Sequence, residues 1–162
     1  MGRSLVINST LLLLAIVLAV AVWLSTEQQN QLSKITLTDL TPNQVNLIVI
    51  DNGSGPAIRF ELQADGWIMT QPAKATADQT KIEKLLQITQ STSFRRFTAP
   101  EKLVEFGLNP PQATLTLNQT RLDMGTLHPI NQRRYIRVGN LVHLTNDRFY
   151  HLLQSAPKSL AP

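Results

Sequence analysis

The sequence contains no cysteine, and this absence excludes several kinds of chemistry at once. Disulfide bridges, thiolate metal sites and a thiol nucleophile all require cysteine. The lipid-modified cysteine of a bacterial lipoprotein is excluded for the same reason. The absence does not indicate a compartment, because it suits an exported domain that avoids disulfides and a cytoplasmic domain equally.

Recognisable catalytic motifs are also missing. The sequence has no Gly-x-Ser-x-Gly motif, no phosphate-binding glycine loop, no His-Glu-x-x-His zinc pattern and no calcium-loop spacing. Its histidines are His128, His143 and His151, and the last stands four residues after Asp147. A carboxylate and an imidazole without a nucleophile do not make an active site. We therefore expect no enzyme, no catalytic residues, no cofactor and no metal site.

One long apolar run dominates the amino-terminal region. Residues Leu11 to Leu24 carry no polar side chain, and extension back to Val6 gives a run long enough, at about 1.5 Å per residue, to cross the roughly 30 Å hydrocarbon core of a bilayer. This predicts a membrane anchor over residues 1–26 that spans the bilayer through residues 6–24. Trp23 lies where an aromatic side chain is expected at the membrane interface.

Two other interpretations of this run exist. Ala19-Val20-Ala21 has the small-x-small pattern of a signal-peptide cleavage site, although the apolar run continues for three residues beyond it. A buried helix of a soluble domain would need a polar face, which the run lacks. Arg3 precedes the run, and the residues that follow it carry few charges until Lys34, which favours a cytoplasmic amino terminus and an extracytoplasmic domain.

The rest of the chain has the composition of one globular domain. We expect a polar stalk over residues 27–33, an extracytoplasmic domain over residues 34–156 and a flexible tail over residues 157–162. Alternating apolar and polar residues, bounded by turn residues, predict the strands. These strands cover residues 35–38, 45–50, 57–62, 67–70, 93–97, 113–117, 121–124, 134–138 and 141–144.

Helices are predicted between some of these strands. Thr76-Ala-Asp-Gln79 has the spacing of a capping box at the start of an amphipathic helix. A short helix should end at Gly107, and Thr145 or Asn146 should cap the last helix. We therefore predict an α+β fold: one amino-terminal transmembrane helix, then a single domain of antiparallel hairpins with two or three packed helices. The order strand, glycine turn, strand, helix occurs twice, with hairpin turns at Asp65-Gly66 and at Gly139-Asn140. This repetition indicates either two related halves or shared hairpin construction.

Positive charge is concentrated in the second half of the chain. The formal net charge is +4, and residues 95–158 contain nine basic and four acidic residues. The strand arginines form a candidate interaction patch, namely Arg95, Arg96, Arg133, Arg134 and Arg137. Clustered guanidinium groups suit anionic lipid headgroups, an acidic polymer or an acidic partner protein. The alternative interpretation is a set of ordinary solvated arginines, and we expect no nucleic acid partner.

Several short motifs occur together in a fixed order. They are Gly66-Trp-Ile-Met-Thr-Gln-Pro72, Ala77-Asp78 at a helix start, Phe106-Gly-Leu-Asn-Pro-Pro111, Leu122-Asp-Met-Gly125 and Arg134-Tyr-Ile-Arg-Val138. Over roughly residues 35–153 the chain resembles the bacterial family called domain of unknown function 4340. Most of the motif positions have structural explanations, and Trp67, Pro72, Phe106, Pro110 and Pro111 are expected either in the core or along a surface groove.

The resemblance implies a cellular setting. Members of that family are expected in the cell envelope behind one membrane helix, and some resemble or accompany membrane subunits of ABC-type transport systems related to gliding motility. The expected location is therefore the bacterial inner membrane, with a membrane or envelope protein as partner. The expected function is that of a non-catalytic binding or accessory subunit of a membrane assembly. The alternatives are an envelope hydrolase with an unrecognised site and a binder of anionic lipid or polymer.

Overall fold

The computed structural model describes residues 16–18, 20, 35–156, 158 and 160–161. The chain divides into two units, Met1–Ile35 and Thr36–Pro162. In the first unit, residues 16–18 and 20 are helical and exposed. The remainder of the predicted anchor, including Trp23, and the polar stalk lie outside the described residues. No helix among the described residues is long and apolar enough to cross a membrane.

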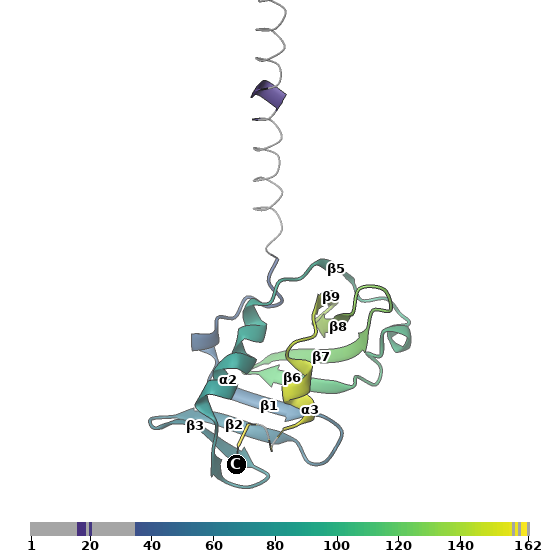
Figure 1. Cartoon of the computed structure of the whole chain (residues 1–162). Coiled ribbons are helices and arrows are strands. Elements are labelled where there is room, and N and C mark those ends of the chain that lie inside the picture. Colours follow the sequence, from purple (N-terminus) through teal and green to yellow (C-terminus); the bar gives the residue numbers. More distant parts are fainter. Residues whose placement is uncertain (1–15, 19, 21–34, 157, 159, 162) are drawn as a thin grey trace, which may run out of the picture. The chain divides into compact units, whose positions relative to one another are not determined.

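In the described part of the second unit, nine antiparallel strands form one sheet in the order β4-β3-β2-β1-β6-β7-β8-β9-β5 (Figure 1). The strands are β1 (Leu47–Asp51), β2 (Ile58–Gln63), β3 (Gly66–Gln71), β4 (Ala75–Thr76), β5 (Arg95–Thr98), β6 (Ala113–Leu117), β7 (Thr120–Leu127), β8 (Arg133–Val138) and β9 (Leu141–Asn146). The connections contain α-helices α2 (Gln79–Leu86) and α3 (Tyr150–Gln154) and 3-10 turns η1 (Pro42–Gln44), η2 (Gln87–Gln90) and η3 (Leu103–Phe106).

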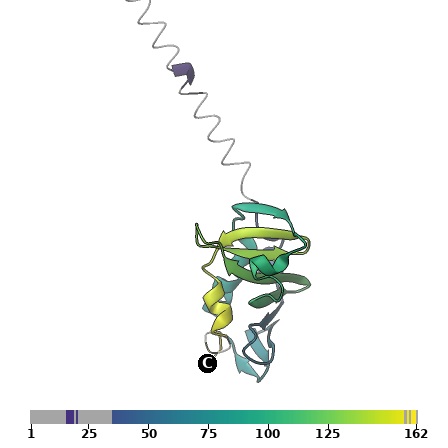
Figure 2. The same cartoon turned by 90° about the vertical axis from the view of Figure 1, so that its right-hand side faces the viewer.

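The predicted fold class is wrong. The described chain is mostly β, it does not show the predicted transmembrane helix, and its hairpins do not form two halves that are each closed by a helix. Instead β1 pairs with β6, with Ile50 opposite Leu115, and this pairing joins the hairpins into one sheet. Strand β5 follows η2 in the chain but pairs with β9 at the far edge. The turned view shows β5 at one end of the sheet and the β2–β3 hairpin at the other (Figure 2).

The turn residues in the sequence predicted local structure correctly, although the predicted fold class is wrong. Gly66 and Gly139 have positive φ angles of 109° and 56° in the β2–β3 and β8–β9 hairpins, which confirms both predicted hairpins. The predicted first strand, residues 35–38, is instead an irregular segment with one bridge between Thr36 and Thr92.

The helix starts differ from the predicted caps. Asp78, and not Thr76, caps α2 by accepting a hydrogen bond from the Lys81 N–H at 3.1 Å. The Gln79 side chain reaches back to Trp67 instead, accepting from its N–H at 2.8 Å and donating to its carbonyl oxygen at 3.0 Å. These bonds hold α2 against β3, where Trp67 is 5% exposed and belongs to the core.

The other two predicted helices are shorter than expected. The predicted helix before Gly107 is only the 3-10 turn η3, and Gly107 ends it in the left-handed conformation, as predicted for its end. The first turn of α3 follows Phe149 without a side-chain cap, because Thr145 and Asn146 belong to β9.

Of the predicted flexible tail, residues 157–162, the structure describes Lys158, which is exposed, and Leu160 and Ala161, which are buried. Leu160 is fully buried in the core, and its carbonyl oxygen accepts a hydrogen bond from the Asp78 N–H at 2.7 Å. The end of the chain therefore stabilises the start of α2.

The two faces of the sheet carry separate apolar clusters. We call the face covered by α2 and α3 the inner face (Figure 1). Its core includes Ile48, Leu115 and Leu122 from neighbouring strands. On the opposite, outer face, η3 and the residues after it cover β8, β9 and β5. There Leu108, Val142 and Leu144 are buried, and the Phe106 ring lies 5.7 Å from Phe97 and 4.9 Å from Tyr135.

Gly125 is the point where the chain segment on the outer face meets the sheet. The pairing of β7 with β8 shifts between Met124 and Leu127, which places Gly125 in a bulge. A side chain on Gly125 would overlap the carbonyl oxygen of Phe106 and lie 3.0 Å from Leu108 Cγ. Two of the sequence motifs, Phe106–Pro111 and Leu122–Gly125, therefore pack directly on each other.

We predict that Gly125→Ala lowers the free energy of unfolding by about 1–3 kcal/mol, the usual cost of overpacking. Gly55→Ala is the matched control, because no atom lies within 4 Å of the position of its added methyl group. The control should change stability by less than about 0.5 kcal/mol. Urea denaturation of the full-length chain measures both values, and equal midpoints would contradict the close packing.

Candidate functional site

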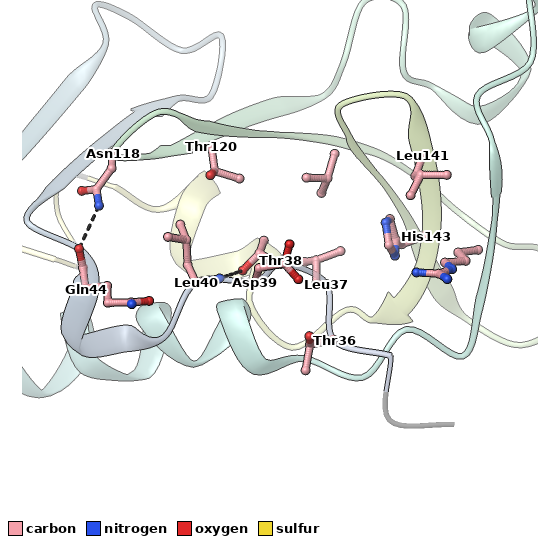
Figure 3. A pocket seen from close by; sticks show the side chains of 12 residues that line it. Thr36, Leu37, Thr38, Asp39, Leu40, Gln44, Asn118, Thr120, Leu141 and His143 are labelled. Atoms are coloured by element: carbon pink, nitrogen blue, oxygen red, sulfur yellow. Dashed lines mark hydrogen bonds between the residues drawn. The ribbon is translucent and has the colours of Figure 1, made fainter. Parts of the chain in front are cut away.

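A cavity of about 580 Å³ lies on the inner face, at the end of the sheet that holds the β6–β7 and β8–β9 turns (Figure 3). This volume lies within the usual range for small-ligand sites. The cavity is lined by Thr36, Leu37, Thr38, Asp39, Leu40, Gln44, Arg96, Asn118, Thr120, Val138, Leu141 and His143.

One wall of the cavity is the irregular segment 36–40, which hydrogen bonds attach to η2 and its flanks. The Leu37 N–H donates to the Ser91 carbonyl oxygen at 2.9 Å. The Thr38 hydroxyl donates to the Thr89 carbonyl oxygen at 3.2 Å. These bonds explain why the segment does not form the predicted strand: its polar groups bind η2 instead of another strand.

Asn118 fixes the mouth of the cavity. It occupies the β6–β7 turn with a positive φ of 55°, a conformation that asparagine tolerates well. Its side-chain oxygen accepts from the Asn46 and Leu47 N–H groups at 3.0 and 3.2 Å, and its amide donates to the Gln44 carbonyl oxygen at 2.8 Å. One side chain thus joins the β6–β7 turn to η1 and to the start of β1.

The sheet side of the cavity is formed by side chains from four strands, β5, β7, β8 and β9. Thr120, Val138 and Leu141 lie on the inner face, and so do the paired residues Arg96 and His143. Arg96 is exposed at the rim, whereas His143 is 3% exposed. A guanidinium group and a buried imidazole therefore lie side by side on neighbouring strands.

The hydrogen bonds of His143 define its tautomer. The Ser93 hydroxyl donates to the Arg95 carbonyl oxygen at 3.0 Å, so its oxygen must accept the 2.9 Å hydrogen bond from His143 Nδ1. The neutral ring then carries its proton on Nδ1 and has an acceptor lone pair at Nε2. Burial lowers the pKa of His143, and the positive charge of Arg96 lowers it further.

Other polar groups of the cavity have no partner within the described part of the chain. Neither the Arg96 guanidinium nor the Asp39 carboxylate forms an ion pair or a side-chain hydrogen bond among the described residues, and the same is true of the Thr36 and Thr120 hydroxyls. The cavity can therefore offer one cation, one anion and several neutral donors or acceptors to a ligand.

The structure separates the arginines of the candidate patch. Arg134 is 4% exposed on the inner face, where its guanidinium contacts both carboxylate oxygens of Asp147 and the Gly125 carbonyl oxygen and lies 3.5 Å from the Tyr150 ring centroid. Asp147 therefore pairs with Arg134. Arg96 lines the cavity on the same face but at the other end of the strands.

The remaining arginines of the patch lie on the outer face. Arg133 stacks on the Phe94 ring at 3.6 Å, and Arg137 binds Asp123 at 2.6 Å. Arg95 is exposed on β5. The five side chains thus occupy both faces of the sheet, and a role in binding remains a prediction for each of them.

Asp123 is a buried carboxylate on the outer face. Burial alone would raise the pKa of Asp123, but hydrogen bonds from Arg121 at 2.7 Å and from Arg137 outweigh that effect and hold the pKa below its ordinary value. Both oxygens are thereby occupied. This cluster ties β7 to β8.

The proline and aromatic motif residues also have defined places. Trp67 lies in the core, and Phe106 lies in the outer cluster between Phe97 and Tyr135. The exposed Pro72 and Pro110 each follow a cis peptide bond, and Pro111 forms a bridge with Leu108.

Sequence analysis did not identify the cavity. Its residues come from five separate segments, and no local pattern predicts that residues 36–40 face Arg96 and His143.

The described residues contain no cluster of three or more His, Cys, Asp or Glu side chains that could hold a metal ion.

Comparison with known proteins gives one match. The model of a family described as "Domain of unknown function (DUF4340)" matches residues 67–160. Neither a curated protein nor a solved structure matches the chain.

We predict that Arg134 is required for stability and Arg133 is not. Arg134→Gln should cost about 3 kcal/mol, because it leaves Asp147 and the Gly125 carbonyl oxygen without their partner. Arg133→Gln should cost less than about 1 kcal/mol, since it removes one exposed cation–π contact. Thermal and urea unfolding measure both, and similar losses in the two neighbours would contradict the assigned roles.

We also predict that His143 makes stability depend on pH. Its pKa is lower in the folded than in the unfolded chain, whose value is about 6.5, so the unfolded chain binds the proton more readily. Stability should therefore fall as the pH drops below about 6.5. The His143→Gln variant should lose that part of the dependence between about pH 7.5 and pH 5, where Asp123 stays ionised. His151→Gln, at an exposed position of α3, is the control, and an unchanged slope in His143→Gln would refute the assignment.

Proposed function

The chain belongs to the DUF4340 family, and from that premise we propose that its domain is a non-catalytic binding module whose cavity takes a small zwitterionic ligand. One observation carries the proposal: a cation, Arg96, and an anion, Asp39, line the same cavity, and neither has an ion-pair partner among the described residues. Unpaired opposite charges in one concave site suit a ligand that brings both signs. A free amino acid is the simplest ligand of that class.

The polar groups assign an orientation to such a ligand. Arg96 matches a carboxylate, because a guanidinium group can bind both of its oxygens. Asp39 and His143 Nε2 are acceptors when the imidazole is neutral, so they match an ammonium group, which has three donors. The hydroxyls of Thr36 and Thr120 can donate a hydrogen bond to the ligand carboxylate or accept one from its ammonium group.

Apolar residues in the same lining favour an aliphatic side chain on the ligand. Leu37, Leu40, Val138 and Leu141 line the cavity together with the polar groups, and Figure 3 shows the three leucines. Contact with these residues adds hydrophobic stabilisation of about 25 cal/mol per Å² of apolar surface removed from water. Leucine or a short peptide with an aliphatic residue combines both features.

The hydrogen bonds of His143 support binding rather than catalysis. A serine nucleophile would donate its proton to the imidazole, whereas the Ser93 hydroxyl donates to the Arg95 carbonyl oxygen and accepts from Nδ1. Ser93 is also buried. The wider setting, an accessory subunit of a membrane assembly in the bacterial envelope, rests on the family resemblance and remains a prediction.

We predict that the full-length chain binds leucine and that Arg96→Gln weakens binding about tenfold or more, which corresponds to the loss of a charge-assisted interaction. Calorimetric titration should give weaker binding for N-acetyl-leucine, which lacks the ammonium group, and for leucinamide, which lacks the carboxylate. The neighbouring variant Arg95→Gln is the matched control, because that side chain leaves the opposite face of β5.

Two outcomes would overturn the proposal. If none of the three compounds binds the wild-type chain, the cavity is not a site for zwitterions of this class. If Arg95→Gln and Arg96→Gln reduce affinity equally, the effect comes from net charge and not from the cavity.

A further inference from the structure

We propose that the groove between α2 and α3 docks an acidic, amphipathic segment of a partner protein. This site is separate from the cavity that carries the proposed function. Its volume is about 480 Å³, and it has basic side chains on both sides and apolar residues at its base. The residues that define it are Lys81, Lys84, Arg148, Phe149, His151 and Leu152.

The basic groups come from both elements. Lys81 and Lys84 are one helical turn apart on α2 and so project from the same side of that helix. Arg148 precedes α3 and His151 lies within it, and both are exposed. None of the described residues that line the groove is acidic, although Lys81 pairs with Asp78 at 3.1 Å. Lys84 and Arg148 have no ion-pair partner among the described residues.

The apolar base makes the groove different from an ordinary basic surface. Phe149 and Leu152 are 6% and 9% exposed, so they offer a narrow apolar strip between the charges. The Arg148 guanidinium lies 4.8 Å from the centroid of the Phe149 ring, which keeps the charge next to the strip. A ligand that fits both the basic side chains and the apolar strip carries carboxylates on either side of an apolar side chain.

This distribution favours a protein segment over other anions. A single phosphate needs donors that converge on one point, whereas these cations are spread along two elements on opposite sides of the groove. A lipid would need room for its acyl chains, but the apolar strip is mostly buried by the domain itself. Alternating acidic and apolar residues of a partner match the spacing of charges and the narrow strip, as in other complexes between complementary charged surfaces.

A fluorescent peptide of alternating glutamate and leucine residues tests the proposal by anisotropy titration with the full-length chain. We expect binding that weakens as salt is raised through the physiological range. The double variant Lys84→Glu/Arg148→Glu should weaken it about tenfold or more. The control Lys74→Glu/Lys102→Glu makes the same change in net charge at exposed lysines outside the groove and should keep affinity within about twofold.

Three further measurements make the test decisive. The milder variant Lys84→Gln/Arg148→Gln should also weaken binding, which guards against misfolding of the charge-reversed chain. Arg96→Gln should keep the peptide affinity, so that failure of the cavity proposal is distinguished from failure of this one. Phosphatidylglycerol vesicles replace the peptide in a parallel titration.

The proposal is overturned if the peptide does not bind the wild-type chain, or if the groove and control variants lose affinity equally. It is also overturned if the groove variants lose binding to the vesicles but not to the peptide, because the groove would then be a lipid site.

Discussion

The close approach of the Phe106–Leu108 segment to Gly125 is the constraint on which the other packing depends. Because residue 125 has no side chain, the segment can lie directly on β7 and cover the outer face. The bulge at the same residue leaves its carbonyl oxygen available to Arg134, which also binds Asp147 just before α3. Gly125 therefore links the Phe106–Leu108 segment, which covers the outer face, to α3 on the inner face.

The opposite end of the strands has a different construction. There the irregular segment 36–40 and η1 close the inner face and are held by hydrogen bonds to η2, Ser91 and Asn118. A wall of this kind is held by polar groups and leaves space beneath it. That space becomes a cavity lined by Arg96, His143 and Asp39 instead of additional core. The candidate site and the packing around Gly125 and Arg134 thus lie at opposite ends of the strands.

Sequence reasoning succeeded where the determining interactions are local. Glycine in the turns identified the hairpins at Gly66 and Gly139, where the structure shows positive φ angles. Two of the motifs that carried the family resemblance, Phe106–Pro111 and Leu122–Gly125, pack on each other. It failed where distant segments decide the outcome. The pairing of β1 with β6 makes one sheet of the predicted hairpin groups, and no local pattern specifies it. From the sequence, Arg134 was predicted to be a surface residue. In the structure it is buried beside Asp147, which lies thirteen positions later in the chain.

The candidate site could not be predicted for the same reason. Arg96 and His143 are ordinary strand residues in the sequence, and their proximity follows only from the pairing of β5 with β9. The most direct test of the account is a nitrogen-15 NMR measurement of the His143 imidazole at neutral pH, with and without leucine. The account predicts a neutral ring protonated at Nδ1, with an Nε2 resonance that shifts when leucine is added. A ring protonated at Nε2, an imidazolium, or an Nε2 resonance that leucine leaves unchanged would contradict it.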